Sequence, residues 1–323
     1  MAGLLSYLLR RILFAIPVFL TVSIITFLIT NASGNPVDLV RLGIKNATPE
    51  QIAALNAYFH VGEPVYTRYF LWLSQFVRGD MGVSLYSGTV ASKILPWVLT
   101  TLELQIPALL ISLGVGIPLG IYSAKRQYSK GDYLVTTTAI FGVSMPTFWI
   151  GIMGIIVFSL YLHWLPSFGA VSAYPPYWWG SIPADEVAHL ILPLAVLSLV
   201  SLATYVRLIR ANMLEALRQD FVLGARASGI SDFKVTYKHA LKSAITPVVT
   251  IIGLTFGSLL AGAPALETTF SWPGLGYEFV VAATSLDLPV VQAITMIITI
   301  MVLVANVGLD LVYALLDPRV RLS

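Results

Sequence analysis

Long runs of apolar residues alternate along the chain with shorter polar segments. The first run, 12–30, carries no charge over 19 residues, about the length that a helix needs to cross the hydrocarbon core of a bilayer. A secretory signal would be shorter and would end at a small-residue cleavage site, so we expect this run to stay as a membrane helix. Five similar runs follow, at 104–122, 133–160, 187–206, 244–266 and 288–309. The pattern therefore predicts six membrane helices.

Residues 31–97 interrupt this pattern with a more polar stretch. Thr48-Pro49-Glu50-Gln51 has the residues of a helix start: a capping threonine, a proline at the first helical position and a glutamine at the third. We expect one helix from there to Phe59 and a second, amphipathic one from about Tyr66 to Val77. The expected parts of the chain are the N-terminus with the first membrane helix (1–30), a helical insertion (31–97) and a five-helix core (98–323).

Composition agrees with an all-α integral membrane protein. Of the 323 residues, 57% are hydrophobic and 11% are charged, and the mean hydropathy of +0.83 lies outside the range of soluble globular proteins. The chain has no cysteine, which excludes disulfides and cysteine-ligated metal centres. Its four histidines have no paired spacing, so we expect neither a metal nor a cofactor on this chain. A net charge of +3 is too small to indicate a nucleic-acid partner.

The basic residues predict an orientation, because Lys and Arg in short loops stay on the cytoplasmic side of a membrane. Of the 19 Lys and Arg residues, 14 lie near the termini, in the loop after the second span and between the fourth and fifth spans. The other five lie in 31–97, and the segments 161–186 and 267–287 have none. We therefore expect both termini in the cytoplasm and the insertion outside.

The segment 211–245 is the most basic stretch between two apolar runs. Its apolar residues keep a helical period up to Ser228, and Gly229 suits the left-handed position that ends a helix. Ser231 can then cap a second helix, with Lys238 and Lys242 towards its end, where the helix dipole favours them. The expected structure is two short helices joined at a glycine.

This segment resembles the cytoplasmic coupling loop of ABC importer permeases. Their general pattern, E-A-A, three residues, G, nine residues, I-x-L-P, is met strictly at Ala225, Gly229 and Leu241. The branch of peptide and nickel permeases fits far better, with Gln219-Asp220-Phe221, ARASGIS and HALKSAITP. ETTFSWPGLG at 267–276 and LLDPRVRL at 315–322 resemble the same branch in the same order, so the resemblance covers nearly the whole chain.

The resemblance implies a permease subunit of a binding-protein-dependent importer, working by alternating access in the plasma membrane of a prokaryote. The implied partners are a second homologous permease, two ATPase subunits that carry ATP and Mg, and an external solute-binding protein. Peptides are the implied cargo, with oligosaccharides or nickel chelates as the alternative. The implied coupling residues are Leu217, Asp220, Phe221, Ala225, Gly229 and Leu241. Leu217, Phe221 and Ala225 are expected to form one apolar face.

Prolines inside the apolar runs indicate irregular helices, and we expect kinks at Pro107, Pro118 and Pro146. Irregular backbone at membrane depth belongs where it lines a cavity or is buried in protein. We therefore place the translocation path at Ser144, Met145, Pro146 and Thr147, and not on the outer faces of the first and sixth spans, represented by Ile25 and Ile298. Glu267 begins an external turn rich in glycine and is a candidate for the gate. For Glu103 and Asp310, close to span ends, a structural role is the simpler interpretation.

Enzyme functions lack their sequence motifs. The chain has no GxxxxGK[ST] phosphate loop, no HExxH and no G-x-S-x-G, so we expect a non-catalytic subunit that takes its energy from a partner. A channel or an ion-coupled secondary transporter remains the alternative of a different class. That alternative predicts ion-coupling charges near the bilayer middle, whereas His189 is the sole ionisable residue within the expected spans.

Overall fold

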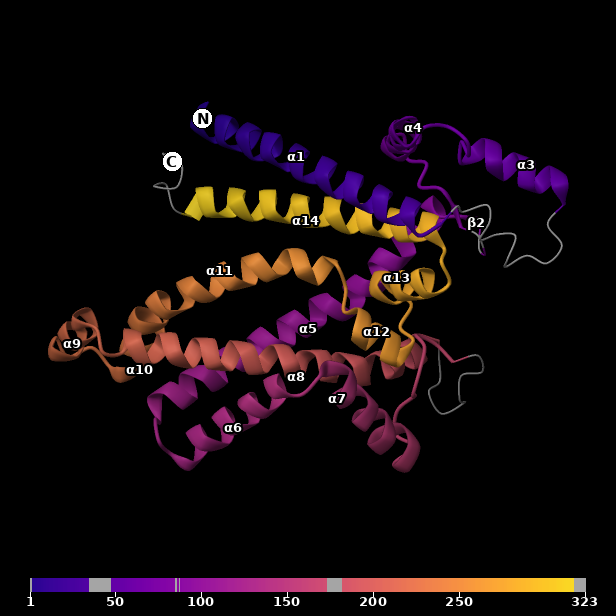
Figure 1. Cartoon of the computed structure of the whole chain (residues 1–323). Helices are drawn as coiled ribbons and strands as arrows, with labels where there is room; N and C mark the ends of the chain where they lie inside the picture. Colours follow the sequence, from indigo (N-terminus) through magenta and orange to yellow (C-terminus); the bar gives the residue numbers. More distant parts are fainter. Residues whose placement is uncertain (1, 35–47, 85, 87, 173–181, 317–323) are drawn as a thin grey trace. The chain divides into compact units, whose positions relative to one another are not determined.

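The computed structural model of the chain describes residues 2–34, 48–84, 86, 88–172 and 182–316, and most of them are helical (Figure 1). The chain forms two compact units. Unit 1 contains the residues up to Leu99 and those from Gly274 onward, and unit 2 is Thr100–Pro273. The long helix α5 (Ala91–Lys125) contributes to both, because the boundary falls within it.

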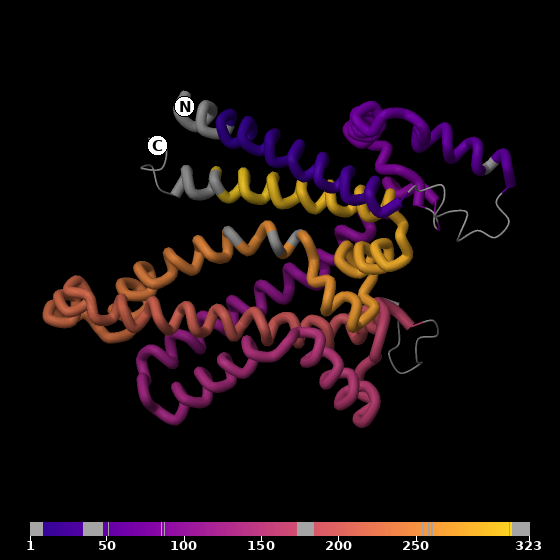
Figure 2. The backbone as a smooth tube through the Cα atoms, in the orientation of Figure 1, coloured from indigo at the N-terminus to yellow at the C-terminus, as the bar shows by residue number. Residues whose placement is uncertain are grey.

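Unit 1 brings together the first and last long helices of the chain. α1 (Ala2–Ala32) and α14 (Leu288–Leu316) lie side by side (Figure 2), and Nε2 of Gln292 donates to Oγ1 of Thr30 at 2.5 Å. Its other helices are α3 (Pro49–Tyr58), α4 (Val65–Val77) and α13 (Leu275–Thr284). Two short antiparallel strands, β1 (Val83–Ser84) and β2 (Gly88–Thr89), pair Val83 with Thr89. The two helices expected in the insertion thus end within one residue of their predicted ends.

Unit 2 is built around α8 (Ile182–Ala216), which packs against α6, α7 and α11. Gly120 lets α5 approach α8 closely, because a Cβ at this position would lie 2.7 Å from the Cβ of Ile209. Besides α5 and α8 the elements are α6 (Lys130–Ser144), α7 (Thr147–Gly154), the π-helix η1 (Ile155–Tyr161), α9 (Asp220–Ala227), α10 (Asp232–Lys234), the π-helix η3 (Val235–Ala240), α11 (Leu241–Leu260) and α12 (Pro264–Phe270).

Within the described residues, five helices are long and apolar enough to cross a membrane. α6 and the continuous α7–η1 helix make a sixth span when the pair, bent by 103°, is counted as one. The six predicted runs coincide with α1, α5, the bent pair, α8, α11 and α14. The prediction of an all-α integral membrane protein is confirmed.

The prolines behave differently from one another. α5 stays one helix through Pro107 and Pro118. At Pro146 the helix is broken, because Met145 and Pro146 take extended backbone conformations, with ψ of 138° and 133°. The predicted irregularity at Pro146 is therefore confirmed, as a break and not a mild kink.

The segment 211–245 differs from the two short helices that the sequence predicts. The first is divided, since α8 ends at Ala216 and α9 begins at Asp220 after a turn. The second does not end near Lys242, because α10, η3 and α11 continue without interruption to Leu260. No glycine or proline stands between Asp232 and Thr246 to stop the helix. The C-terminal motif at 315–322 lies largely outside the described residues.

Candidate coupling surface and gate

The turn between α9 and α10 is a helix end built on glycine. Gly229 has φ +77°. Its N–H donates to the carbonyl of Arg226 at 3.0 Å, and the N–H of Ile230 donates to the carbonyl of Ala225 at 3.2 Å, which is the Schellman pattern. A Cβ at Gly229 would meet no atom within 4 Å. The predicted helix end at Gly229, which we call the hinge, is confirmed. Glycine suits this position because the backbone is left-handed there. Ser231 precedes α10 without a side-chain capping bond.

The predicted coupling residues do not share one surface. Asp220, Phe221 and Gly229 are exposed, whereas Leu217, Ala225 and Leu241 pack against the core of unit 2. The expectation that Leu217, Phe221 and Ala225 form one outward apolar face is therefore wrong. The turn at 217–219 breaks the helical phase between α8 and α9, and Val222, which is fully buried, anchors α9 to the core.

Two exposed aromatic residues that the sequence reasoning missed lie on the helix after the hinge. Phe233 and Tyr237 are 70% and 45% exposed, and their ring centroids are 4.7 Å apart. Phe221 and Leu223 of α9 are exposed as well, and we use the name coupling surface for the exposed side chains of these four residues. The i, i+4 spacing of Phe233 and Tyr237 within a basic helix is the sequence signal that could have revealed this pair.

Exposed ion pairs hold this region to the end of α5. Nζ of Lys125 lies 2.6 Å from Oδ2 of Asp232, and Nη2 of Arg226 lies 3.7 Å from Oδ1 of the same carboxylate. Pairs of this kind contribute about 0–1 kcal/mol each, because water solvates both partners. Asp232 therefore orients α9 and α10 relative to α5 more than it stabilises the unit.

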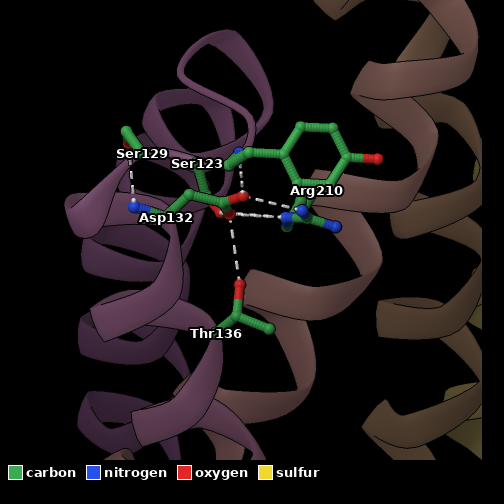
Figure 3. A network of polar contacts seen from close by, with 6 residues as sticks. Ser123, Ser129, Asp132, Thr136 and Arg210 are labelled. Carbon is green, nitrogen blue, oxygen red and sulfur yellow. Dashed lines mark hydrogen bonds and ion pairs between the residues drawn. The ribbon is translucent and has the colours of Figure 1, made fainter.

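A buried carboxylate joins α5, α6 and α8 (Figure 3). Asp132 is 2% exposed, and the guanidinium of Arg210 binds it with two hydrogen bonds, from Nε at 2.8 Å and from Nη2 at 2.9 Å. The hydroxyl of Ser123 donates to the same carboxylate, as do the N–H of Tyr128 at 2.9 Å and the hydroxyl of Thr136 at 3.2 Å. A bidentate pair with further donors is the geometry in which a buried charge is well satisfied.

The break between α6 and α7 exposes a short non-helical segment. Ser144 and Pro146 are exposed, and Met145 and Thr147 are half-buried. The hydroxyl of Ser144 donates to the carbonyl of Ile140 at 2.8 Å, so it satisfies its own helix. The carbonyl of Pro146 starts α7 by accepting from the N–H of Trp149 at 3.0 Å.

Glu267 is fully buried in unit 2. Its Oε1 accepts from the backbone N–H of Ala263, the N-cap residue of α12, at 3.0 Å. The hydroxyl of Thr101 on α5 lies 3.4 Å from the same oxygen. Nearby, the indole of Trp272 donates to the carbonyl of Thr100 at 2.9 Å. Glu267 thus fixes α12 to α5. Glu103, the acidic residue of α5 that the sequence interpretation assigned a structural role, is exposed.

His189, which looks isolated in the sequence, belongs to a buried polar cluster. Its Nδ1 contacts the carbonyl of Gly169 at 2.9 Å, and its Nε2 contacts the hydroxyl of Ser172 at 3.0 Å. The N–H and hydroxyl of Ser172 donate to Asp185, which is fully buried, at 2.7 and 2.9 Å. The cluster fastens the segment after η1 to the start of α8.

Comparison with known proteins covers almost the whole chain. The family described as binding-protein-dependent transport system inner membrane component matches residues 116–322, and the one described as the N-terminal part of such membrane components matches 4–90. The oligopeptide transport system permease protein AppB of Bacillus subtilis is 38% identical over 320 residues, 98% of this chain and 99% of that protein. The dipeptide transport system permease proteins DppB of Alkalihalophilus pseudofirmus and Escherichia coli are both 36% identical, over 98% of this chain and 100% and 99% of their own length.

Proposed function

Because this chain belongs to the family of binding-protein-dependent transport system inner membrane components, we propose that it is the permease subunit of an ABC importer that moves peptides inward across a bacterial inner membrane. The observation that carries the proposal is the match, over nearly the full length of both chains, to permease proteins of oligopeptide and dipeptide transport systems. A second homologous permease, two ATPase subunits that bind ATP and Mg, and an external solute-binding protein complete the importer.

The coupling surface is the part of this chain that would contact an ATPase subunit. Phe221, Leu223, Phe233 and Tyr237 are exposed, and the lysines around them keep this region out of the bilayer. Exposed apolar side chains on short helices bind partner proteins by entering an apolar groove. Because α10, η3 and α11 are continuous, a movement of the surface is passed directly to the fifth membrane span.

The translocation path runs beside the break at Ser144, Met145, Pro146 and Thr147. Backbone that leaves the helix at membrane depth is tolerated where it is buried in protein or lines a water-filled cavity. Two of these four residues are exposed in the isolated chain, which leaves them available to a path completed by the second permease. Glu267 supports the gate indirectly, by fixing α12 against α5.

The orientation follows from the 14 basic residues on one side against five on the other. With basic loops retained in the cytoplasm, both termini and the coupling surface are cytoplasmic, and the insertion is external. The ATPase subunits and the binding protein then meet this chain on opposite sides of the membrane.

The test is transport by the assembled importer in proteoliposomes, with peptide uptake and ATP hydrolysis measured together. Gly229→Asp should abolish both uptake and the stimulation of hydrolysis by the loaded binding protein. Its charged side chain would intrude on the groove of the ATPase subunit, and the left-handed conformation adds a cost of about 1–2 kcal/mol for a residue with a Cβ. Phe221→Ala should lower both more mildly.

The matched control is Gly224, an exposed glycine within α9. Neither Gly224 nor Gly229 has an atom within 4 Å of a built Cβ, and Gly229 alone of the two has a positive φ. Gly224→Ala should therefore leave coupling intact while Gly229→Ala weakens it. Normal uptake and stimulation in Gly229→Asp would refute the coupling role. Identification of the ligand that co-purifies with the binding protein decides the cargo, and a sugar or a nickel chelate would overturn the peptide assignment.

A further inference from the structure

Unit 1 holds a cavity of about 60 Å³ that the transport mechanism above does not use. It lies among the end of α1, the end of α3, the helix α4 and the first turn of α14, and the segment before β1 also lines it. At about 10–15 Å³ for each water, it has room for about four to six waters. At about 30 Å³ each, these waters have a liquid volume of about 120–180 Å³, roughly that of a dipeptide of small residues.

One wall of the cavity carries a cation without a partner. Arg68 of α4 lines it, and within the described part of the chain its buried Nε atom has no hydrogen-bond acceptor. No carboxylate of that part lies within ion-pair distance of its guanidinium either. An N–H that is shut off from water without an acceptor costs free energy, and a guanidinium binds a carboxylate through two parallel hydrogen bonds. Among the described residues, no anionic group meets this guanidinium.

An anion, the exposed carboxylate of Asp80, lines the same cavity. Asp80 accepts hydrogen bonds from the N–H of Gly82 at 3.0 Å and from the hydroxyl of Tyr58, 3.3 Å from each carboxylate oxygen. Burial, with Asp80 beside it, raises the pKa of Tyr58 to about 12, so its hydroxyl remains a donor at neutral pH. These neutral donors hold the carboxylate in place without cancelling its charge, and no cation among the described residues pairs with it.

Opposite charges that line one cavity without pairing with each other are complementary to a ligand that carries both charges. The aromatic side chains of Phe27 and Trp72, with ring centroids 5.6 Å apart, also line it and supply an apolar wall for the ligand's body. We propose that this cavity binds a short zwitterionic peptide, with the peptide carboxylate at Arg68 and its ammonium group at Asp80. The choice of a peptide rests on the proposed function.

The experiment measures equilibrium binding of radiolabelled dialanine to the assembled importer, without its binding protein, in phosphatidylcholine nanodiscs. Wild type should bind dialanine and not its N-acetylated, C-amidated form. Arg68→Gln should weaken binding roughly tenfold or more, Arg68→Lys should weaken it less, and Asp80→Asn should resemble Arg68→Gln, since each removes a charge-assisted contact. Arg78→Gln is the matched control, because Arg78 is an exposed arginine just after α4 that does not line the cavity.

Three results would overturn the inference: no binding by wild type, equal binding of the capped peptide, or equal affinity in Arg68→Gln and Arg78→Gln. Loss of dialanine binding when phosphatidylethanolamine is added would also overturn it, by assigning the cavity to a zwitterionic lipid headgroup. Peptide uptake with the binding protein present separates the two proposals. Normal uptake with no dialanine binding rejects the cavity alone, whereas absence of peptide uptake in wild type rejects the proposed function.

Discussion

Two aspartates of unit 2 make ion pairs that differ in burial, and burial decides what each contributes. Asp132 is almost inaccessible and receives both arms of Arg210, whereas the side chain of Asp232 is 59% exposed beside Lys125. Removing one partner of a buried pair strands the other charge, which costs far more than the loss of a solvated pair.

We expect Asp132→Asn to destabilise the purified chain by about 3 kcal/mol, the lower end of the range for buried pairs because water reaches part of Arg210. Asp232→Asn, the same substitution in an exposed pair, should cost about 0–1 kcal/mol. Thermal unfolding in detergent checks both variants. Equal unfolding midpoints for Asp132→Asn and wild type would show that the buried pair does not stabilise the fold.

A functional or structural residue can be identified from the sequence when the constraint on it is local, but not when its partner lies far away along the chain. Gly229 can be identified because a left-handed helix end needs glycine whatever surrounds it. Asp132 and Arg210 stand 78 positions apart, so nothing in the local pattern joins them. The contact of Glu267 with Thr101, 166 positions away, was missed for the same reason.

At the scale of elements, the apolar pattern predicts where helices cross the membrane but not where they stop outside it. A helix ends where a residue or a turn interrupts its hydrogen bonding. Asp232–Thr246 offers no such residue, so α10, η3 and α11 run from the hinge as one continuous helix. No glycine or proline in 217–219 indicates the turn that the structure has there. Because this turn shifts the helical phase, the sequence interpretation placed Leu217 and Ala225 on the wrong face.

Phe233 and Tyr237, on the helix after the hinge, give a prediction at the scale of elements. Replacement of Phe233 and Tyr237 together by alanine should at least halve the stimulation of ATP hydrolysis by the loaded binding protein, with little change in the unfolding midpoint, because both side chains are exposed. Tyr161→Ala, which removes an exposed aromatic residue at the end of η1, is the control and should leave stimulation unchanged. Full stimulation in the double variant would exclude these rings from the contact.

The break between α6 and α7 gives another. Tryptophan at Ser144 or Thr147 should reduce peptide uptake several-fold, since bulk at this segment would obstruct the proposed path. Ile25 on α1 is 51% exposed and is a suitable control. Ile298, placed by the sequence interpretation on an outer face, packs against the core of unit 1 and would confuse packing with transport. Uptake that is equally reduced by tryptophan at Ile25 and at Ser144 would count against a path at the break.

At the scale of the whole molecule, the charge asymmetry predicts which side each segment faces. The chain has no cysteine, so single cysteines can be introduced at Gln51 and Ser231 without removing any. An impermeant maleimide added to intact cells should label position 51 and spare position 231, with both labelled after permeabilisation. Labelling of 231 in intact cells would reverse the orientation and move the coupling surface to the wrong side for ATP.

The hydrogen bonds around Asp132 also bear on the order in which the chain is made. At about 5–20 residues per second, translation delivers Arg210 roughly 4–16 seconds after Asp132. In that interval the carboxylate already has Ser123, the N–H of Tyr128 and Thr136, all within nine positions along the chain. The nascent α5–α6 hairpin can therefore enter the bilayer with its charge solvated by its own groups, and the arrival of Arg210 with α8 completes the pair and joins the later half of the protein to the earlier one.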